Sequence, residues 1–347
     1  MKFVYSQTMK TVRALNSLIL AAIPLAFLVP SATAQEANPS ITISATDKTA
    51  ASEVTSAPKH ALGLSSVNRK ALWASGKPVT LSSAATTLPV IPPPGFYPGD
   101  LSNPGGGPTV QTAKSHNLYV NCAPSCWGNP GVFQNNLDHS DMIHITDQYT
   151  GTSANNRYTI GTSGLVVGSF APILFDADIL AIAHAGAAIF GNGYHEIYHI
   201  FLPPGQDVCF TGSSPLECYS PDNLTTFFFC AYHGSVDFTD IGHVLFTVEP
   251  YQNVNGCNVV QPSPNGGLID STADVLSHET FETITDPDID AWYNHFDLDL
   301  FGAEIGDECQ DFDFGYGKVS LNGKNYEIQP EYSNSQHGCA FSPYVTP

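Results

Sequence analysis

The segment Ser271–Pro287 reads STADVLSHETFETITDP and carries both the clearest helix signals of the chain and its clearest candidate for chemistry. Ser271 or Thr272 can cap a helix, because a short hydroxyl side chain accepts a hydrogen bond from a free backbone N–H group there. Helix-forming residues follow, and an Asp-Pro pair stops the helix. The sequence therefore predicts a helix that starts at Asp270 or Ser271 and ends before Pro287.

Two side chains of this helix have the spacing of metal ligands. His278 and Glu282 lie four residues apart, so they project from the same side of the helix. Glu279 is turned by about 100° from His278 and can reach a metal-bound water without binding the metal. This HExxE pattern is that of the zinc-protease helix, with a carboxylate in place of the second imidazole. The alternative is an ordinary solvated helix in an acidic protein.

A third metal ligand has to come from another segment. Glu304 and Asp307 lie in GAEIGDEC, where one carboxylate can complete the coordination and the other can accept the free ring N–H of His278. The rival ligands are His295, Asp297 and Asp299. A set of one histidine and two carboxylates is harder and more negative than the usual two histidines and one carboxylate. Zn²⁺ is the first choice, with Mn²⁺ or Ca²⁺ as alternatives.

A second segment, YHEIYHIF from Tyr194, spells His-Glu-x-x-His in full, but its surroundings predict a strand. GNG precedes it, two prolines follow it closely, and its Tyr, Ile and Phe residues favour strands. On a strand, His195 and His199 lie on one face while Glu196 points to the other. We therefore expect the match to the zinc motif to be accidental.

The remaining pattern predicts an α+β domain with a mixed sheet. Another helix is expected over DADILAIAHAGAAIFG, capped by Asp176 or Asp178 and ended by Gly191. Alternating and β-branched runs predict strands over NLYVN, MIHITDQY, GLVVGSF, HEIYHIFL, TTFFFCAYH and GHVLFTVEPY. KVSLNGKNYEIQ predicts a C-terminal hairpin, in which Asn322 and Gly323 form the tight turn.

The chain has eight Cys residues, all beyond residue 120. An even number of Cys in an exported chain predicts disulfides rather than a thiolate zinc site, since no Cys-x-x-Cys pair is present. Position along the chain favours two pairs, Cys122 with Cys126 and Cys309 with Cys339. The pairing of the other four cannot be deduced from the sequence.

The N-terminus predicts export. Basic residues, the apolar run LNSLILAAIPLAFLV and SATA before Gln35 form a secretory signal, expected to be cleaved after Ala34. Residues 35–113 are rich in Ala, Ser, Thr and Pro, and we expect a disordered linker or a propeptide there. One domain, residues 114–347, follows and is large enough for a substantial core.

The domain is strongly acidic. From His116 onward, 28 Asp or Glu residues stand against only Arg157, Lys318 and Lys324. Such a charge repels nucleic acid and anionic lipid. Beyond the signal, no segment approaches the roughly 20 apolar residues that span a membrane. We expect a secreted protein, extracellular or periplasmic, that neither binds nucleic acid nor inserts into membranes.

The segments VLSHETFETITDPDIDAWYN, EIGDEC and YEIQPEYSNSQHGCA, in this order, resemble the phosphate-induced, EXORDIUM-like extracellular proteins of plants and their bacterial relatives. IYHIFLPP and FFFCAYHG also look like strands of that family, and the likeness covers roughly Asn117 to Ala340. The resemblance implies a zincin-like fold in which Glu279 is the base. The metal ligands that it implies are His278, Glu282 and Glu304.

These features together predict a secreted, zinc-dependent, metallopeptidase-like protein that hydrolyses peptide bonds in extracellular protein. The metal would activate a water molecule, and Glu279 would take and return its proton. The alternative is a non-catalytic extracellular module, associated with cell-wall or matrix material, in which the same ligands hold a structural ion. A third interpretation has no metal. Substrate specificity, metal identity and oligomeric state stay open.

Overall fold

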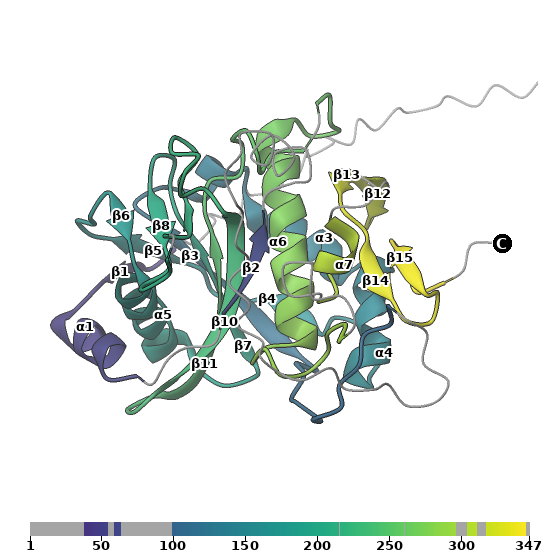
Figure 1. The fold of residues 1–347 in the computed structure, drawn as a ribbon, viewed down its shortest axis with the longest axis horizontal. Helices are drawn as coiled ribbons and strands as arrows, with labels where there is room; N and C mark the ends of the chain where they lie inside the picture. Colours follow the sequence, from purple (N-terminus) through teal and green to yellow (C-terminus); the bar gives the residue numbers. More distant parts are fainter. Residues whose placement is uncertain are drawn as a thin grey trace, which may run out of the picture. The chain divides into compact units, whose positions relative to one another are not determined.

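A mixed sheet of eight strands lies at the centre of the fold, with helices on both of its faces (Figure 1). The computed structural model describes residues 38–54, 59–63, 99–214, 216–259, 261–295, 304–310 and 317–344. The strands of the sheet are β1 (Ser40–Thr42), β2 (Lys59–Gly63), β3 (Ala113–Val120), β4 (Tyr158–Ile160), β5 (Gly164–Val167), β7 (Glu196–Phe201), β10 (Phe229–Phe238) and β11 (Gly242–Glu249).

Most neighbouring strands of this sheet are parallel. The strand order is β1-β5-β3-β7-β11-β10-β2, with β4 paired to β3. Only β10 is antiparallel to its neighbours, β11 and β2. Parallel strands are usually covered on both faces and therefore consist almost wholly of buried residues, as β3 and β7 do. The predicted combination of helices with a mixed sheet is confirmed.

The two long helices cover opposite faces of the sheet (Figure 1). The alternation along β7 shows this, because Tyr198 and Ile200 join the apolar cluster that contains α5, whereas Ile197 and Phe201 join the cluster that contains most of the core residues of α6. The helices are α1 (Ala45–Ser52), α3 (Pro130–Asp138), α4 (Asp147–Thr150), α5 (Asp176–Phe190), α6 (Gly267–Thr285) and α7 (Asp307–Gln310), with 3₁₀ helices η1 (Pro124–Trp127) and η2 (Met142–Thr146).

Both predicted helices are present. In α5, the Asp178 carboxylate accepts a hydrogen bond from the backbone N–H of Phe175 at 3.0 Å, and Gly191 ends the helix with a φ of 122°. Helix α6 begins at Gly267, earlier than predicted. Asp270 thus lies in the first turn, where its negative charge faces the positive end of the helix dipole, and it accepts a hydrogen bond from the backbone N–H of Asn265.

The predicted strand over MIHITDQY is wrong. This segment forms η2 followed by α4. Two hydroxyl groups bond back to the carbonyls of the preceding turn: Thr146 donates to the carbonyl of Ile143 at 2.7 Å, and Thr150 donates to that of Thr146 at 3.1 Å. Such local bonds satisfy the backbone without a neighbouring strand, and the β-branched residues alone did not reveal them.

Part of the segment 35–113 belongs to the sheet, so the expected disorder does not hold for its described residues. Strand β1 pairs with β5 at one edge of the sheet, and β2 pairs with β10 at the other. Helix α1 lies beside α5 (Figure 1), and its Asp47 carboxylate contacts the buried ring of His184 at 2.7 Å. Strand β3 also starts at Ala113, before the predicted domain boundary. Removal of the segment as a propeptide stays a prediction.

Small sheets complete the fold. The predicted hairpin is formed by β12 (Gly317–Leu321) and β13 (Lys324–Ile328), and both turn residues, Asn322 and Gly323, have positive φ angles, of 49° and 78°. Strands β14 (Glu331–Ser333) and β15 (Gly338–Ala340) form a second pair, and β6 (Ile173–Leu174), β8 (Asp207–Cys209) and β9 (Cys218–Tyr219) form a third sheet. Figure 1 shows β12 to β15 beyond α6, on the side away from the main sheet.

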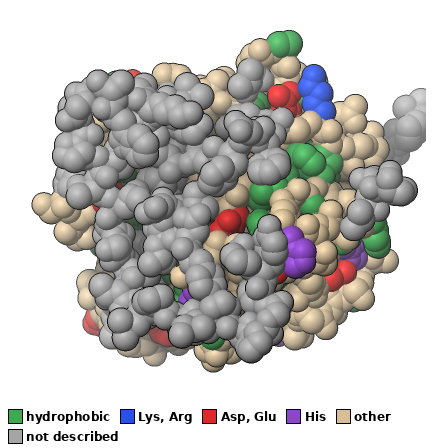
Figure 2. Space-filling model, turned by 45° about the vertical axis from the view of Figure 1, so that its right-hand side comes forward, with side chains coloured by type: hydrophobic (Ala, Val, Ile, Leu, Met, Phe, Trp, Pro, Cys, Tyr) green, Lys and Arg blue, Asp and Glu red, His purple; other side chains and the backbone are tan. Residues whose placement is uncertain are grey.

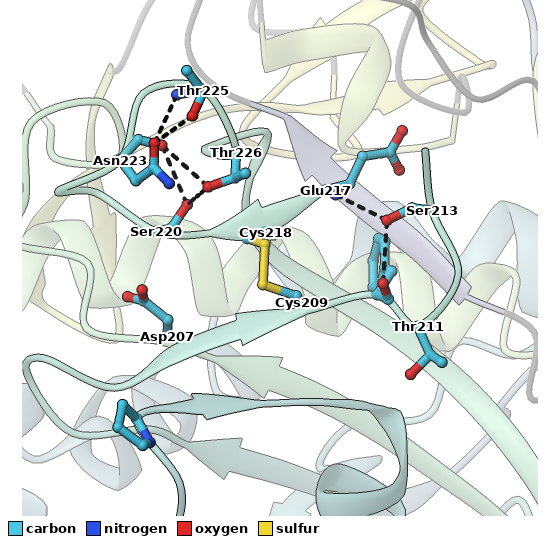
Figure 3. The surroundings of a disulfide bond; sticks show 12 residues. Asp207, Cys209, Thr211, Ser213, Glu217, Cys218, Ser220, Asn223, Thr225 and Thr226 are labelled. Carbon is cyan, nitrogen blue, oxygen red and sulfur yellow. Dashed lines mark hydrogen bonds between the residues drawn. A yellow bond between two sulfur atoms is a disulfide. The ribbon is translucent and has the colours of Figure 1, made fainter. Parts of the chain in front are cut away.

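The eight Cys residues form four disulfides, and none is free. The bonds are Cys122–Cys126, Cys209–Cys218, Cys230–Cys257 and Cys309–Cys339. The first and the last are the two pairs that the sequence favoured. Figure 3 shows the second, which joins β8 to β9. Hydrogen bonds of Ser213 hold the loop between these strands, and those of Asn223 hold the loop that follows β9. The disulfides therefore fasten the small elements around the central sheet.

The surface carries few basic side chains. On the face drawn in Figure 2, Lys and Arg side chains occur at one place near the upper edge, whereas Asp and Glu side chains occur at several. The whole chain has a formal net charge of -20. None of the described helices has the length and apolar character required to cross a membrane.

We expect the Cys230–Cys257 disulfide to contribute more stability than Cys122–Cys126. The first bond closes a segment with a separation of 27 residues and the second one of 4 residues. A disulfide lowers the conformational entropy of the unfolded chain. This raises the free energy of unfolding by about 3–4 kcal/mol for the longer loop and about 2 kcal/mol for the shorter one. Unfolding in guanidinium chloride of the two double Ala variants measures the difference. An equal loss of stability in both variants would contradict the expectation.

Candidate metal centre

Helix α6 brings three of the predicted site residues into the protein interior. His278, Glu279 and Glu282 each have 0% of their surface exposed, and every residue from Asp270 to Thr285 is buried. The helix contacts β10 and β11 on one side and the hairpin strand β13 on another. A buried carboxylate is costly unless a hydrogen bond, a proton or a cation compensates its charge. An ordinary solvated helix is therefore not what this sequence forms.

The first group of potential ligands consists of His278, Glu282 and Asp307. The Nε2 atom of His278 lies 2.8 Å from Glu282 Oε1 and 3.7 Å from Asp307 Oδ1. The backbone of Gly306 packs directly against the His278 ring, and only glycine fits there, because a Cβ atom at this position would lie only 2.4 Å from Nδ1 of His278. The backbone N–H of Tyr332 donates to the carbonyl of Ile305 and holds the loop in place.

A second group, His233, Glu279 and Glu282, shares one member with the first. His233 lies on β10, and its Nδ1 atom is 3.4 Å from Glu279 Oε2 and 3.4 Å from Glu282 Oε2. Glu304, the third predicted ligand, has its Oε1 atom 3.8 Å from Nε2 of His233. The two donor groups thus contain His278, Glu279, Glu282 and Asp307 of the predicted site, whereas the predicted ligand Glu304 belongs to neither group. His233 is a histidine that sequence reasoning missed. The sequence signal that could have identified His233 is its place as a polar residue at the end of the apolar run TTFFFCAYH.

A backbone carbonyl orients the ring of His233. Its Nε2 atom lies 3.2 Å from the carbonyl oxygen of Asp286, which can only accept a hydrogen bond, so Nε2 carries the proton. In a neutral ring the lone pair of Nδ1 then faces the carboxylates of Glu279 and Glu282. A histidine that binds a metal commonly donates its other N–H to a backbone carbonyl in this way. The arrangement suits a cation between the three side chains.

Further buried carboxylates surround the two groups. Four of them, which the sequence analysis did not name, are Glu249, Asp274, Asp286 and Glu331. Asp274 is 3% exposed, and each of the others is at most 1% exposed. Within the described part of the chain, no Lys or Arg side chain forms an ion pair with them; the basic side chain that does form one, Arg157, contacts Asp147. Among the described residues, neither carboxylate oxygen of Glu331 or Glu279 has a hydrogen-bond partner. The centre is therefore rich in buried carboxyl groups, whose negative charge has to be neutralised by protons or metal ions.

Burial raises the pKa of these carboxyl groups. Loss of solvent is the main cause, and it raises the pKa of Asp274 to about 7 and that of Glu249 to about 8. Loss of solvent followed by repulsion from Glu282 raises the pKa of Glu279 and of Glu331 well above the usual value for Glu. Without a bound cation, these groups retain protons to a higher pH than exposed carboxyl groups do.

The other candidates of the sequence lie elsewhere. The predicted strand is confirmed as β7; His195 directly precedes it and His199 lies within it. The Nδ1 atom of His195 is 3.1 Å from the carbonyl oxygen of Thr112, and that of His199 is 3.0 Å from Thr247 Oγ1. Neither belongs to the donor groups found among the described residues, nor does the rival ligand His295. The other rival ligands, Asp297 and Asp299, lie outside the described residues.

Comparison of the chain with family models, curated proteins and solved structures gives no significant match. The resemblance to EXORDIUM-like proteins therefore stays a prediction from the quoted segments. The interpretation of the site rests on the arrangement of its own residues.

Without metal, the protein should lose stability as pH rises from about 4 to about 8. Asp274 has an ordinary pKa of 3.8 and a native value of about 7, and Glu249 has 4.5 and about 8. Between the two values the native state binds more protons than the unfolded state, so rising pH favours unfolding, by at most about 1.4 kcal/mol per group and pH unit. Thermal unfolding in EDTA across this range measures the effect.

Added Zn²⁺ should restore stability at pH 7, because a metal binds carboxylates in their ionised form. A metal-free protein whose melting temperature rises throughout this pH range would show that the buried carboxyl groups do not control its stability.

Proposed function

We propose that this chain is a secreted metal-dependent hydrolase that cleaves peptide bonds in extracellular protein. The observation that supports it is the convergence of His278, Glu282 and Asp307, whose ligand atoms lie within 4.8 Å of one another, with the carboxylate of Glu279 beside them. Four disulfides agree with an oxidising, extracellular setting. The zincin-like fold and the EXORDIUM-like family are parts of the same proposal.

The donor atoms are those that a hydrolytic metal ion uses. His278 supplies an imidazole nitrogen, and Glu282 and Asp307 supply carboxylate oxygens, with Glu304 as a further carboxylate nearby. When bound, Zn²⁺ polarises a carbonyl oxygen and lowers the pKa of a bound water. Mn²⁺ is the alternative that this carboxylate-rich set suits best, followed by Ca²⁺.

The role of the protein is to hold the ion and to handle the proton. Glu279 is adjacent to His278 in sequence and turns toward His233 and Glu282. Burial and the nearby Glu282 raise its pKa well above the usual value for Glu, so the carboxylate accepts a proton more readily than an exposed one does. As a base it would take the proton of the attacking water and give it to the leaving amine.

A second candidate function is a non-catalytic extracellular module with a structural ion. Burial favours it, because His278, Glu282 and Asp307 are each 0% exposed, whereas a catalytic metal keeps one position open to water and substrate. In this alternative the ion joins α6 to α7 and stabilises the fold without turnover. The two functions differ in whether Glu279 matters for activity or only for structure.

We expect Glu279→Gln to abolish peptide hydrolysis while the protein still binds the ion of the His278 group. Glutamine keeps the size of the side chain but cannot take a proton, so turnover should fall by about 10²–10⁴-fold. His278→Ala removes a ligand and should lower both metal content and activity. Turnover of an unstructured protein substrate and metal analysis after dialysis measure these effects.

His195→Ala is the matched control, because it removes an exposed histidine from the His-Glu-x-x-His segment and should change neither quantity. If the metal-loaded wild type cleaves no substrate in a broad panel of unstructured proteins between pH 3 and 8, the structural-ion function replaces the hydrolase. If His278→Ala retains the full metal content, the assignment of the ligands is wrong.

A further inference from the structure

We propose that the centre binds two metal ions bridged by the carboxylate of Glu282. One ion lies between His278, Glu282 and Asp307, and the second between His233, Glu279 and Glu282. The use of the second ion in catalysis rests on the proposed function, but the binding of two ions does not.

The orientation of Glu282 carries the proposal. Its Oε1 atom faces His278 at 2.8 Å, and its Oε2 atom faces His233 at 3.4 Å. The two oxygens of one carboxylate thus belong to different donor groups, each of which contains its own histidine. A carboxylate with this arrangement can bridge two ions, and two-metal sites of hydrolases hold their ions about 3.5–4 Å apart.

The spacing of the second group fits an ion better than hydrogen bonds. Nδ1 of His233 lies 3.4 Å from an oxygen of Glu279 and 3.4 Å from an oxygen of Glu282. Ligands at 2.0–2.1 Å from a tetrahedral Zn²⁺ are about 3.3 Å from one another, whereas N–H···O hydrogen bonds are usually no longer than about 3.2 Å. The carbonyl of Asp286 also fixes the ring so that Nδ1 faces the two carboxylates.

Glu279 points independently to a cation. Its side chain is 0% exposed, and neither of its carboxylate oxygens has a hydrogen-bond partner in the part of the chain that the structure describes. Glu331, which belongs to neither donor group, is also 0% exposed and without hydrogen-bond partners at both oxygens, and its charge interacts with Glu282 and Asp307. Buried carboxyl groups of this kind need protons or cations nearby.

The charge of the centre also favours two ions. One divalent ion compensates half of the charge on the four ionised carboxylates at the two donor groups, and two ions compensate all of it; these carboxylates are Glu279, Glu282, Glu304 and Asp307. In the arrangement with two ions, Glu279 is a ligand rather than the base, and its replacement still abolishes turnover because the second ion is lost.

The number of bound ions tests the proposal. Chelator-stripped protein is dialysed against Zn²⁺ at pH 7.5, and metal per chain is measured by mass spectrometry. We expect two ions in the wild type and one in Glu279→Gln and in His233→Ala. Glu331→Gln, a change of the same type at an equally buried site outside both donor groups, should retain two. Far-ultraviolet circular dichroism verifies that each variant is folded.

Manganese tests the bridge in the wild type alone, so the outcome does not depend on any variant. Two Mn²⁺ ions bridged by Glu282 are magnetically coupled, and electron paramagnetic resonance should then show a coupled spectrum instead of the six lines of an isolated ion. One ion per chain in both the wild type and Glu279→Gln, with an isolated-ion spectrum, would overturn the proposal of two ions.

The two proposals can fail separately. A wild type that binds one ion and cleaves peptide bonds retains the hydrolase and excludes the second ion. A wild type that binds two coupled ions and cleaves nothing retains the two-ion centre and excludes the hydrolase. A wild type that binds no ion excludes both.

Discussion

The burial of carboxylates around helix α6 is the constraint on which the rest of the structure depends. Glu279, Glu282 and Asp307 are 0% exposed, at a place where the sheet covers one side of the helix and the hairpin strand β13 another. Removing these groups from water is unfavourable unless positive charge or protons accompany them. Helix α6 nevertheless buries Glu279 and Glu282 between the main sheet and β13, where packing alone would favour apolar residues. The proposed cation would account for both the burial and the convergence of two histidines.

Local signals of the sequence were sufficient for the elements that local interactions decide. The end of α6 at an Asp-Pro pair, the end of α5 at Gly191 and the turn at Asn322 and Gly323 depend on residues close in sequence, and the structure contains all three. The strand over HEIYHIFL was likewise predictable, because strand-forming residues outweighed the zinc motif. The strand predicted over MIHITDQY was wrong, because hydroxyl groups of this segment stabilise helical turns that β-branching alone does not indicate.

The features that could not be predicted from the sequence depend on contacts between residues far apart in the chain. His233 lies 45 residues before His278 by number and reaches the centre only because β10 packs beneath α6. Glu331 likewise depends on the course of the chain after the hairpin. The N-terminal segment was predicted to be disordered from its composition, yet β1 and β2 pair with opposite edges of the sheet. Edge strands need only backbone partners, so a weak side-chain pattern did not reveal them.

Protons and metal ions compete for the same groups in this centre, and this links the site to the composition of the whole chain. At low pH, protons neutralise the buried carboxyl groups, and the fold needs no metal. As pH rises, the raised pKa values mean that each ionisation costs more than in water, unless an ion takes the place of the proton. Metal binding therefore releases protons, and affinity should increase with pH until the raised pKa values are passed. With a net charge of -20, the remainder of the chain adds a field that attracts cations to the centre. The acidic surface and the buried site thus act in the same direction, since both favour cations over anions.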